Sequence, residues 1–314
     1  MATRKQASAR DVAMITPRWL VRNPLPEPSA SGDKDDRGTV LVVGGAVEVP
    51  GAVVLAGIGA LRAGAGKLQM ATCRDVVPQI GVIVPEALVA PLDQTSDGGI
   101  AASAADDIVR RAKKAKGLLL GPGMMENDDV APIVRRVLTD LPEIPIALDA
   151  AALGALRTVG DAARARPTPA MLVLTPHAGE LAAMLGIDRD DVAPRARELA
   201  ERAARELRAV VVLKGATTFI ACEGERTCCY DEGDVGLATS GSGDTLAGVI
   251  TGLLARGAAP MLAACWGVWL HGAAGNALER RIGRIGFLAR ELLDEIPRVM
   301  SRTEKKRRPK KRRR

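Results

Sequence analysis

The sequence contains few aromatic rings and few histidines. Its 314 residues include three Trp, one Tyr, two Phe and two His. Proteins that bind single-stranded nucleic acid stack its bases on aromatic side chains, so this composition argues against that function. Two histidines also leave little material for a His-based metal centre, and we predict no dedicated metal site in the protein.

Cysteine usage excludes two further classes of protein. The chain has five cysteines, an odd number, and they include no C-x-x-C pair. Neither a disulfide framework nor a zinc site is therefore indicated, and the pattern favours a reducing compartment. The apolar run at residues 12–15 is too short for the core of a secretory signal peptide. We expect the protein to be cytoplasmic.

The sequence also lacks a hydrophobic run long enough to cross a membrane. The longest apolar stretch, residues 258–274, contains a proline, two glycines and His271. It falls short of the ~20 residues that a spanning helix needs. We interpret it as a buried helix that carries His271 as a hydrogen-bonded core residue, and we expect no membrane partner.

Positive charge is concentrated at the C-terminal end of the chain. The formal net charge is +7, but residues 305–314 hold nine Lys or Arg and no acidic residue. Setting those nine aside leaves 35 basic residues against 37 acidic ones, so the body is nearly neutral. Like charges without apolar residues cannot offset chain entropy, so we predict a disordered basic tail over residues 301–314. Such a tail could bind nucleic acid weakly, although a solvated end without function is the interpretation that we favour.

Hydrophobic patterning predicts one α/β domain over residues 34–300, after an N-terminal extension of residues 1–33 that is interrupted by prolines. Alternating strands and helices indicate a mainly parallel sheet with helices on both faces. The expected strands are 39–43, 67–72, 87–90, 118–120, 145–148, 171–174 and 210–213, followed by a hairpin of 217–221 with 226–230. The expected helices are 12–20, 51–63, 102–114, 130–138, 178–185, 192–207, 244–256, 259–279 and 287–299.

Small and polar residues follow most of these strands. Ligands of open parallel sheets bind at the carboxyl ends of the strands. The segments expected to meet there are 44–52, 121–124, 149, 175–177, 214–218 and 236–244. Their repeated position after strands is the main argument from the residues alone for an enzyme.

The strongest of these segments runs Gly-Leu-Ala-Thr-Ser-Gly-Ser-Gly-Asp from residue 236 to Asp244 and leads into an apolar helix. Gly241 and Gly243 leave backbone N–H groups accessible at a helix start, where an anion is favoured. Asp244 in the first turn could deprotonate a hydroxyl. The simpler interpretation, that Ser242 or Asp244 only caps the helix, does not explain so many glycines.

Two other strand ends carry weaker signals. Lys214 begins a Lys-Gly-Ala-Thr-Thr segment between two strands, which is either a tight turn or a grip on a nucleotide phosphate. The sequence contains no G-x-x-x-x-G-K-[ST], so it is not a Walker-type loop. His177 follows Thr-Pro at a strand end, and a lone loop histidine is more often a structural hydrogen-bonding group than a catalyst.

Taken together, the segments resemble the ADP-dependent NAD(P)H-hydrate dehydratase family within the ribokinase-like superfamily. The similarity extends from about Lys34 to Pro297, and it implies a three-layer α/β/α sandwich in a single-domain form without the epimerase domain of some members. The motifs that carry it, in chain order, are Lys34–Gly45, Pro50–Ala52, Ala60–Gly66, Gly121–Met124, Leu174–Glu180, Leu213–Thr217 and Ser240–Asp244.

The resemblance implies a repair reaction in which hydrated NADH or NADPH is dehydrated while ADP, or ATP, is consumed, with Mg²⁺ accompanying the nucleotide. Asp244 would remove the proton of the C6 hydroxyl, the terminal phosphoryl group would move to that oxygen, and phosphate would then be expelled. It also implies a homo-oligomer, in some members a tetramer. By position, the hydrate would contact Ala52, Gly123, His177 and Asp244; the nucleotide would contact Lys214, Gly215, Ala216, Thr217, Thr218 and Gly243; and the anion hole would be Gly241, Ser242 and Gly243.

The sequence departs from the family pattern at three positions. Ala151 replaces the second carboxylate of an Asp-Ala-Asp motif, Ser240 replaces a glycine, and Asp234 stands where an Asn is usual. These changes lie at the expected rim of the pocket and leave the expected base in place.

Two other functions stay open. The first is a ribokinase-like kinase acting on a small vitamin-precursor alcohol, which would release a stable phosphorylated product. The second is a nucleic-acid-binding or regulatory protein that uses the basic tail on an inactive enzyme-like body.

Overall fold

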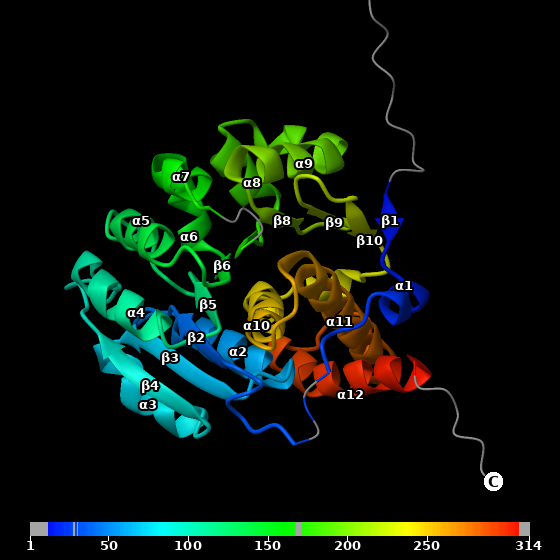
Figure 1. Cartoon of the computed structure of the whole chain (residues 1–314), viewed down its shortest axis with the longest axis horizontal. Helices are drawn as coiled ribbons and strands as arrows, with labels where there is room; N and C mark the ends of the chain where they lie inside the picture. Colours follow the sequence, from blue (N-terminus) through cyan, green and yellow to red (C-terminus); the bar gives the residue numbers. More distant parts are fainter. Residues whose placement is uncertain (1–11, 28, 30, 168–170, 308–314) are drawn as a thin grey trace, which may run out of the picture.

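The computed structural model describes residues 12–27, 29, 31–167 and 171–307. Their strands form one ten-stranded sheet in the order β1-β10-β9-β8-β7-β6-β5-β2-β3-β4 (Figure 1). Every neighbouring pair is parallel except β8 with β9 and β9 with β10. The strands are β1 Ala13–Met14, β2 Thr39–Val43, β3 Lys67–Cys73, β4 Ala87–Leu92, β5 Gly117–Leu120, β6 Ile146–Leu148, β7 Leu172–Leu174, β8 Val210–Leu213, β9 Thr218–Ala221 and β10 Cys228–Tyr230.

Helices cover both faces of this sheet and complete three layers. One layer contains α2, α10 and α11, with α12 packed outside them; the other contains α4, α5, α7 and α9 (Figure 1). The expected α/β class with a mainly parallel sheet is confirmed. The helices are α1 Pro17–Arg22, α2 Pro50–Arg62, α3 Val77–Ile83, α4 Ala105–Ala112, α5 Val130–Asp140, α6 Ala151–Gly154, α7 Leu156–Arg164, α8 Ala178–Leu185, α9 Ala196–Leu207, α10 Ser242–Ala255, α11 Pro260–Arg281 and α12 Ala289–Arg307.

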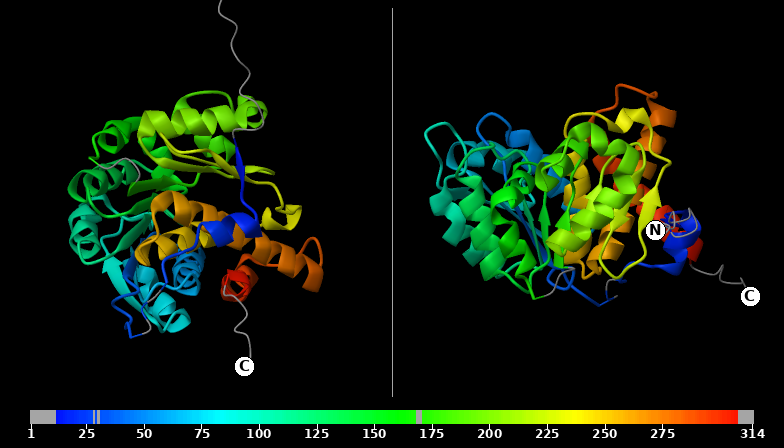
Figure 2. Two further views of the ribbon diagram at one scale, coloured as in Figure 1. Left: turned by 45° about the vertical axis from the view of Figure 1, so that its right-hand side comes forward. Right: turned by 90° about the horizontal axis from the view of Figure 1, so that it is seen from above.

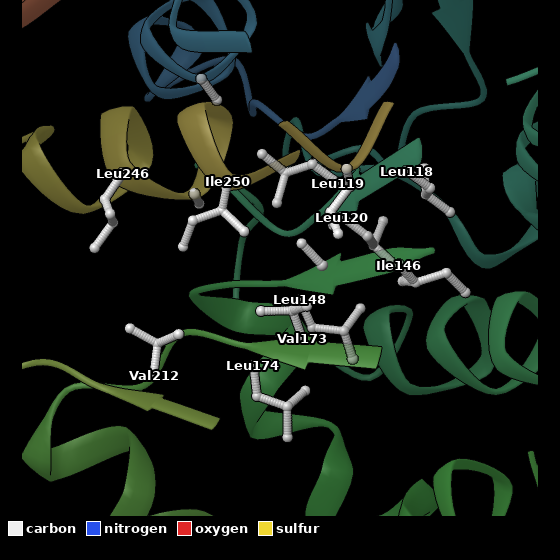
Figure 3. Close-up of a cluster of buried hydrophobic side chains, with 14 of the residues drawn as sticks. Leu118, Leu119, Leu120, Ile146, Leu148, Val173, Leu174, Val212, Leu246 and Ile250 are labelled. Atoms are coloured by element: carbon white, nitrogen blue, oxygen red, sulfur yellow. The ribbon is translucent and has the colours of Figure 1, made fainter. Parts of the chain in front are cut away.

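The central strands are apolar over their whole length. All residues of β5, β6, β7 and β8 are buried, as expected for strands covered on both faces. Figure 3 shows their side chains with Leu246 and Ile250 of α10, two residues that recur at helical spacing and face the sheet. This packing places the first turn of α10 beside the strand ends.

After β2 the chain continues to a strand on one side of the sheet, and after β5 it continues to a strand on the other side. These two strands are parallel neighbours, with Val43 opposite Leu120, and their following helices, α2 and α5, lie on different faces. Such a reversal opens a crevice at the carboxyl edge of a sheet. At this point Gly45 N–H donates to Pro122 O at 2.7 Å, which joins the loops that follow the two strands.

The N-terminal extension is more integrated than the sequence indicated. Residues 13 and 14 form β1 beside β10, and α1 replaces the single helix expected over residues 12–20. The indole N–H of Trp266 donates to Asn23 O at 2.7 Å, which fixes the segment to α11. The views in Figure 2 show this segment, in blue, running alongside the C-terminal helix, in red.

Two further boundaries differ clearly from the predicted ones. Helix α12 continues to Arg307, so the expectation of a disordered tail from residue 301 is wrong as far as that residue; the rest of the basic run, 308–314, lies outside the described residues. The helix expected over residues 192–207 begins as α9 at Ala196, after short 3₁₀ turns. Within the described ranges, no helix is both long and apolar enough to cross a bilayer.

Candidate functional site

The start of α10 is shaped to face a ligand. Gly241 precedes the helix with a φ of +85°, and a Cβ added there would lie 2.4 Å from Leu55 Cδ1. Only glycine fits this left-handed, crowded position. Among the described residues no side chain caps the helix, so its first turn keeps unused N–H groups and a partial positive charge.

Asp244 lies in this first turn, as predicted, and is half-buried. Burial raises the pKa of its carboxyl to about 6; the charge of Asp149 adds to the rise and that of Lys214 opposes it. A carboxylate with such a pKa is ionised at pH 7 yet basic enough to accept a proton from a positioned hydroxyl.

Lys214 reaches into the same place from the end of β8. Its Nζ lies 3.2 Å from Asp149 Oδ1, 3.8 Å from Glu180 Oε2 and 3.4 Å from where a Cβ on Gly243 would stand. Burial alone would lower the pKa of Lys214, but the two carboxylates outweigh it and raise the pKa. The ammonium is therefore charged and lies close to Gly243.

Asp149 is a candidate site residue to which sequence reasoning gave no role. Its side chain is 3% exposed and accepts hydrogen bonds from Lys214 Nζ and from Thr175 Oγ1, the latter at 2.7 Å. The next residue, Ala150, has a φ of +49°, a strained value for a residue with a side chain. The signal available in the sequence was the position of Asp149 directly after an apolar strand, in the same way that Thr175 directly follows the next strand.

His177 has a structural task in this conformation. It caps α8: its Nδ1 accepts from Glu180 N–H at 3.1 Å, while Glu180 Oε2 accepts from the His177 N–H at 2.6 Å. The ring itself is exposed, and the backbone pairs with Lys214 as an isolated bridge. The capping box thus positions Glu180, a second residue that sequence reasoning missed, beside Lys214.

The switch point between β2 and β5 brings together the other two residues expected at the substrate. Gly123 has a φ of +66°, and a Cβ there would lie 2.7 Å from both Ala52 Cβ and Val49 O. Ala52 is buried in the first turn of α2, directly against this glycine. The loop at Gly123 and the start of α2 therefore approach each other closely, and Gly123 adds no side chain to the surface beside the crevice.

The rest of the expected nucleotide loop is open to solvent. Gly215 and Ala216 are exposed, and Thr217 and Thr218 are half-buried at the start of β9. Of the residues that depart from the family pattern, Ala151 is buried in α6 and Ser240 is exposed. Asp234 accepts from Gly236 N–H at 3.3 Å, a turn that the usual Asn could also make.

Ser242 and His271 meet at the first turn of α10. Ser242 Oγ lies 2.8 Å from His271 Nε2 of α11. The expectation that His271 is hydrogen-bonded is confirmed, but the residue is half-buried rather than a core residue, and its partner belongs to the expected anion hole. The described residues contain no group of three or more His, Cys, Asp or Glu arranged to hold a metal ion.

A cavity of about 500 Å³ lies away from this cluster, between α9 and the turn joining β9 to β10. Its lining mixes arginines with glutamates and includes Arg197, Glu201 and Arg205. The register of β8 with β9 places that turn at the amino edge of the sheet. The cavity and the cluster of ionisable groups therefore lie at opposite edges of the sheet, and cavity volume alone does not locate that cluster.

Comparison with known families decides the class of protein. The family model described as NAD(P)H-hydrate dehydratase matches residues 40–298. The chain belongs to this family. An ADP-dependent (S)-NAD(P)H-hydrate dehydratase of Xanthomonas campestris is 45% identical over 292 residues, with 93% of this chain and 97% of the relative covered. The Bacillus subtilis enzyme of the same name is 37% identical, with 93% and 100% covered.

Solved structures agree with this family membership. A B. subtilis ADP/ATP-dependent NAD(P)H-hydrate dehydratase, co-crystallised with ATP and Mg²⁺, has a TM-score of 0.78 and 32% identity, covering 94% of this chain and 100% of that one. A ribokinase-like protein of Enterococcus faecalis has a TM-score of 0.79 at 21% identity and shows the fold alone. The ribokinase-like architecture expected from the motifs is confirmed.

Proposed function

We propose that this protein carries out its reaction at the strand-end cluster of Asp244, Lys214 and Asp149. The protein is an ADP-dependent NAD(P)H-hydrate dehydratase, a hydro-lyase that repairs hydrated NAD(P)H, as its family membership establishes. The observation that carries the proposal is the position of Asp244: a carboxylate with a pKa of about 6 stands in the uncapped first turn of a helix, near the half-buried ammonium of Lys214.

Asp244 is the proposed base for phosphoryl transfer. It takes the proton of the C6 hydroxyl as that oxygen forms a bond to the terminal phosphorus of ADP and the bond from phosphorus to AMP breaks. The ring nitrogen lone pair then expels phosphate from C6, and loss of a proton from the neighbouring ring carbon restores the dihydropyridine. The phosphoryl step is useful because phosphate leaves far more readily than hydroxide.

The first turn of α10 and Lys214 supply the stabilisation of charge. Gly241, Ser242 and Gly243 form the proposed anion hole, where backbone N–H groups and the helix dipole face the moving phosphoryl group. Lys214 is close enough to Gly243 to neutralise the same group. Asp149 and Glu180 hold the ammonium in place.

The remaining assignments are proposals from position. The hydrate would lie against Ala52, Gly123 and His177, and the nucleotide would follow residues 214–218. Mg²⁺ would arrive with the nucleotide and be held largely by phosphate oxygens and water, as is common for this ion. A solved relative was co-crystallised with ATP and Mg²⁺, so either nucleotide is compatible with the proposal.

The proposal is tested by following all three products. Protein incubated with hydrated NADH, ADP and Mg²⁺ should restore the absorbance of reduced nicotinamide and release AMP and free phosphate in equal amounts. A stable phosphorylated alcohol without recovery of the absorbance would instead identify the kinase. The same assay with hydrated NADPH and with ATP gives the substrate preference.

Cell context and assembly are further proposals. Free cysteines at all five positions favour a reducing compartment, and we propose the cytoplasm. We also propose a homo-oligomer, with a tetramer as one form, to be measured by light scattering.

Residues 34–300 are proposed as the catalytic domain. Removing residues 308–314 should leave turnover unchanged. If the full-length protein binds DNA and the shortened protein does not, while turnover stays intact, the basic tail has a role in that binding.

A further inference from the structure

The contact between Ser242 and His271 has no role in the reaction as described so far. Ser242 is buried at the first position of α10, and its hydroxyl lies 2.8 Å from His271 Nε2. The N-cap of α10 is Gly241, so the capping position offers no side chain to this helix, and Ser242 follows as its first residue. The Ser242 side chain is directed to the neighbouring helix α11.

The imidazole of His271 is neutral under ordinary conditions. Burial lowers the pKa of His271 to about 4; a hydrogen bond at the Ser242 backbone opposes the shift, and the charge of Lys214 adds to it. A neutral imidazole carries one N–H, so Nε2 either donates to the serine or accepts from it. The chemistry of the ligand distinguishes the two arrangements.

An ionised phosphoryl group presents only hydrogen-bond acceptors. A serine hydroxyl beside it must therefore donate its single proton to the phosphoryl oxygen. The hydrogen bond between Ser242 Oγ and His271 Nε2 then requires its proton from the histidine. Only the tautomer with the proton on Nε2 satisfies both contacts at once.

We propose that His271 is a positioning residue for phosphoryl transfer: its Nε2–H holds the Ser242 hydroxyl so that this hydroxyl donates to the transferring phosphoryl group. The inference rests on the proposed function, because it needs the anion at the start of α10. It extends the anion hole by one side-chain donor and gives α11 a part in the reaction. The effect belongs to kcat, since the donor acts most strongly on the charge of the transition state.

Two amide variants separate positioning from packing. In His271→Gln the side-chain N–H₂ can occupy the place of Nε2, whereas in His271→Asn the amide is too short to reach Ser242. Both variants keep a polar, uncharged group at this site. Asn276→Ala is the matched control on α11, because it removes a hydrogen bond to Glu232 O and does not touch Ser242.

The experiment is a double-mutant cycle with Ser242→Ala, measuring kcat and KM for ADP and for hydrated NADH. We expect Ser242→Ala and His271→Asn each to lower kcat by about 10-fold or more with KM nearly unchanged, since the first removes the Ser242 donor and the second leaves that same donor unpositioned. The double variant should be no slower than the slower single one. His271→Gln should keep most of the turnover, and Asn276→Ala should stay within about two-fold of the parent.

The opposite pattern overturns the inference. Losses that multiply in the double variant, or equal losses in His271→Gln and His271→Asn, would mean that the histidine does not act through the serine. Asp244→Asn is measured in parallel to separate this failure from that of the proposed function. If Asp244→Asn is inactive while Ser242→Ala is not slowed, the base stands and the Ser–His pairing falls. If Asp244→Asn turns over like the parent, the site itself is misassigned.

Discussion

The two edges of the sheet each hold a cation, Arg166 buried and Lys214 half-buried, and the two cations differ in what surrounds them. At the amino edge, Arg166 is 2% exposed and is held by neutral groups alone. Its guanidinium donates to four backbone carbonyls at the end of α5 and in the turn before β6, those of Leu138, Leu141, Pro142 and Ile144, at 2.9 to 3.2 Å. Such carbonyls are left without partners at a helix end, and a cation there is favourable.

At the carboxyl edge, Lys214 is held by two carboxylates and lies beside an uncapped helix start. Its charge lowers the pKa of Asp244 and of His271, so it interacts electrostatically with both groups. Arg166 has no such neighbours; burial lowers its pKa to about 10 and leaves it charged at neutral pH. A buried charge therefore marks a reactive site only where it interacts with other ionisable groups.

The largest expected effect is on Asp244. Asp244→Asn should lower turnover by ~10²-fold or more, the range for losing a general base. The ionised carboxylate is disfavoured in the fold, because its folded pKa of about 6 exceeds the ordinary value of 3.8. Stability therefore falls as pH rises through that window, and the variant should melt no lower than the parent at pH 7. Turnover within a few-fold of the parent would show that another group removes the proton.

Arg166 should show the reverse: a large effect on stability and a small one on catalysis. Arg166→Met leaves several buried carbonyls without a donor and should lower the free energy of unfolding by about 3 kcal/mol. Denaturant titration measures this change. The folded variant should keep its KM and kcat; a loss of turnover in fully folded protein would contradict the division between the two edges.

The smallest effects are on the pH profile of kcat/KM, which should rise as Asp244 ionises near pH 6. Asp149→Asn removes a charge that raises the pKa of Asp244, so the inflection should move to lower pH. Lys214→Met removes a charge that lowers it, and the inflection should move to higher pH. Glu180→Gln should move it down by less than Asp149→Asn. Shifts in the same direction for all three variants would mean that the profile reports another group.

Local signals in the sequence were enough for the class of fold and for one part of the site. The apolar runs at β5 to β8 and the glycines before Asp244 are contiguous patterns, and strand burial and helix geometry depend directly on such patterns. The place of Asp244 in the first turn of α10 was therefore predicted correctly. The end of α12 was not, because adjacent like charges indicated disorder while the helix continued to Arg307.

Partners that are distant in the chain could not be found in this way. Asp149 and Lys214 are 65 residues apart, and Ser242 and His271 are 29 apart on different helices. No periodicity relates such positions. The same limit applies to Arg166, which resembles any surface arginine in the sequence and is buried only because the turn before β6 folds over it.

What the sequence determined by itself is the alternation of buried strands and amphipathic helices, together with one loop that only glycine can form. These features depend on neighbours within a few residues. The tertiary structure alone decided which charges meet: the strand order places the ends of β6, β7 and β8 side by side, so that Asp149, Thr175 and Lys214 share one small volume. Charges interact through space, and distance in space is set by the sheet.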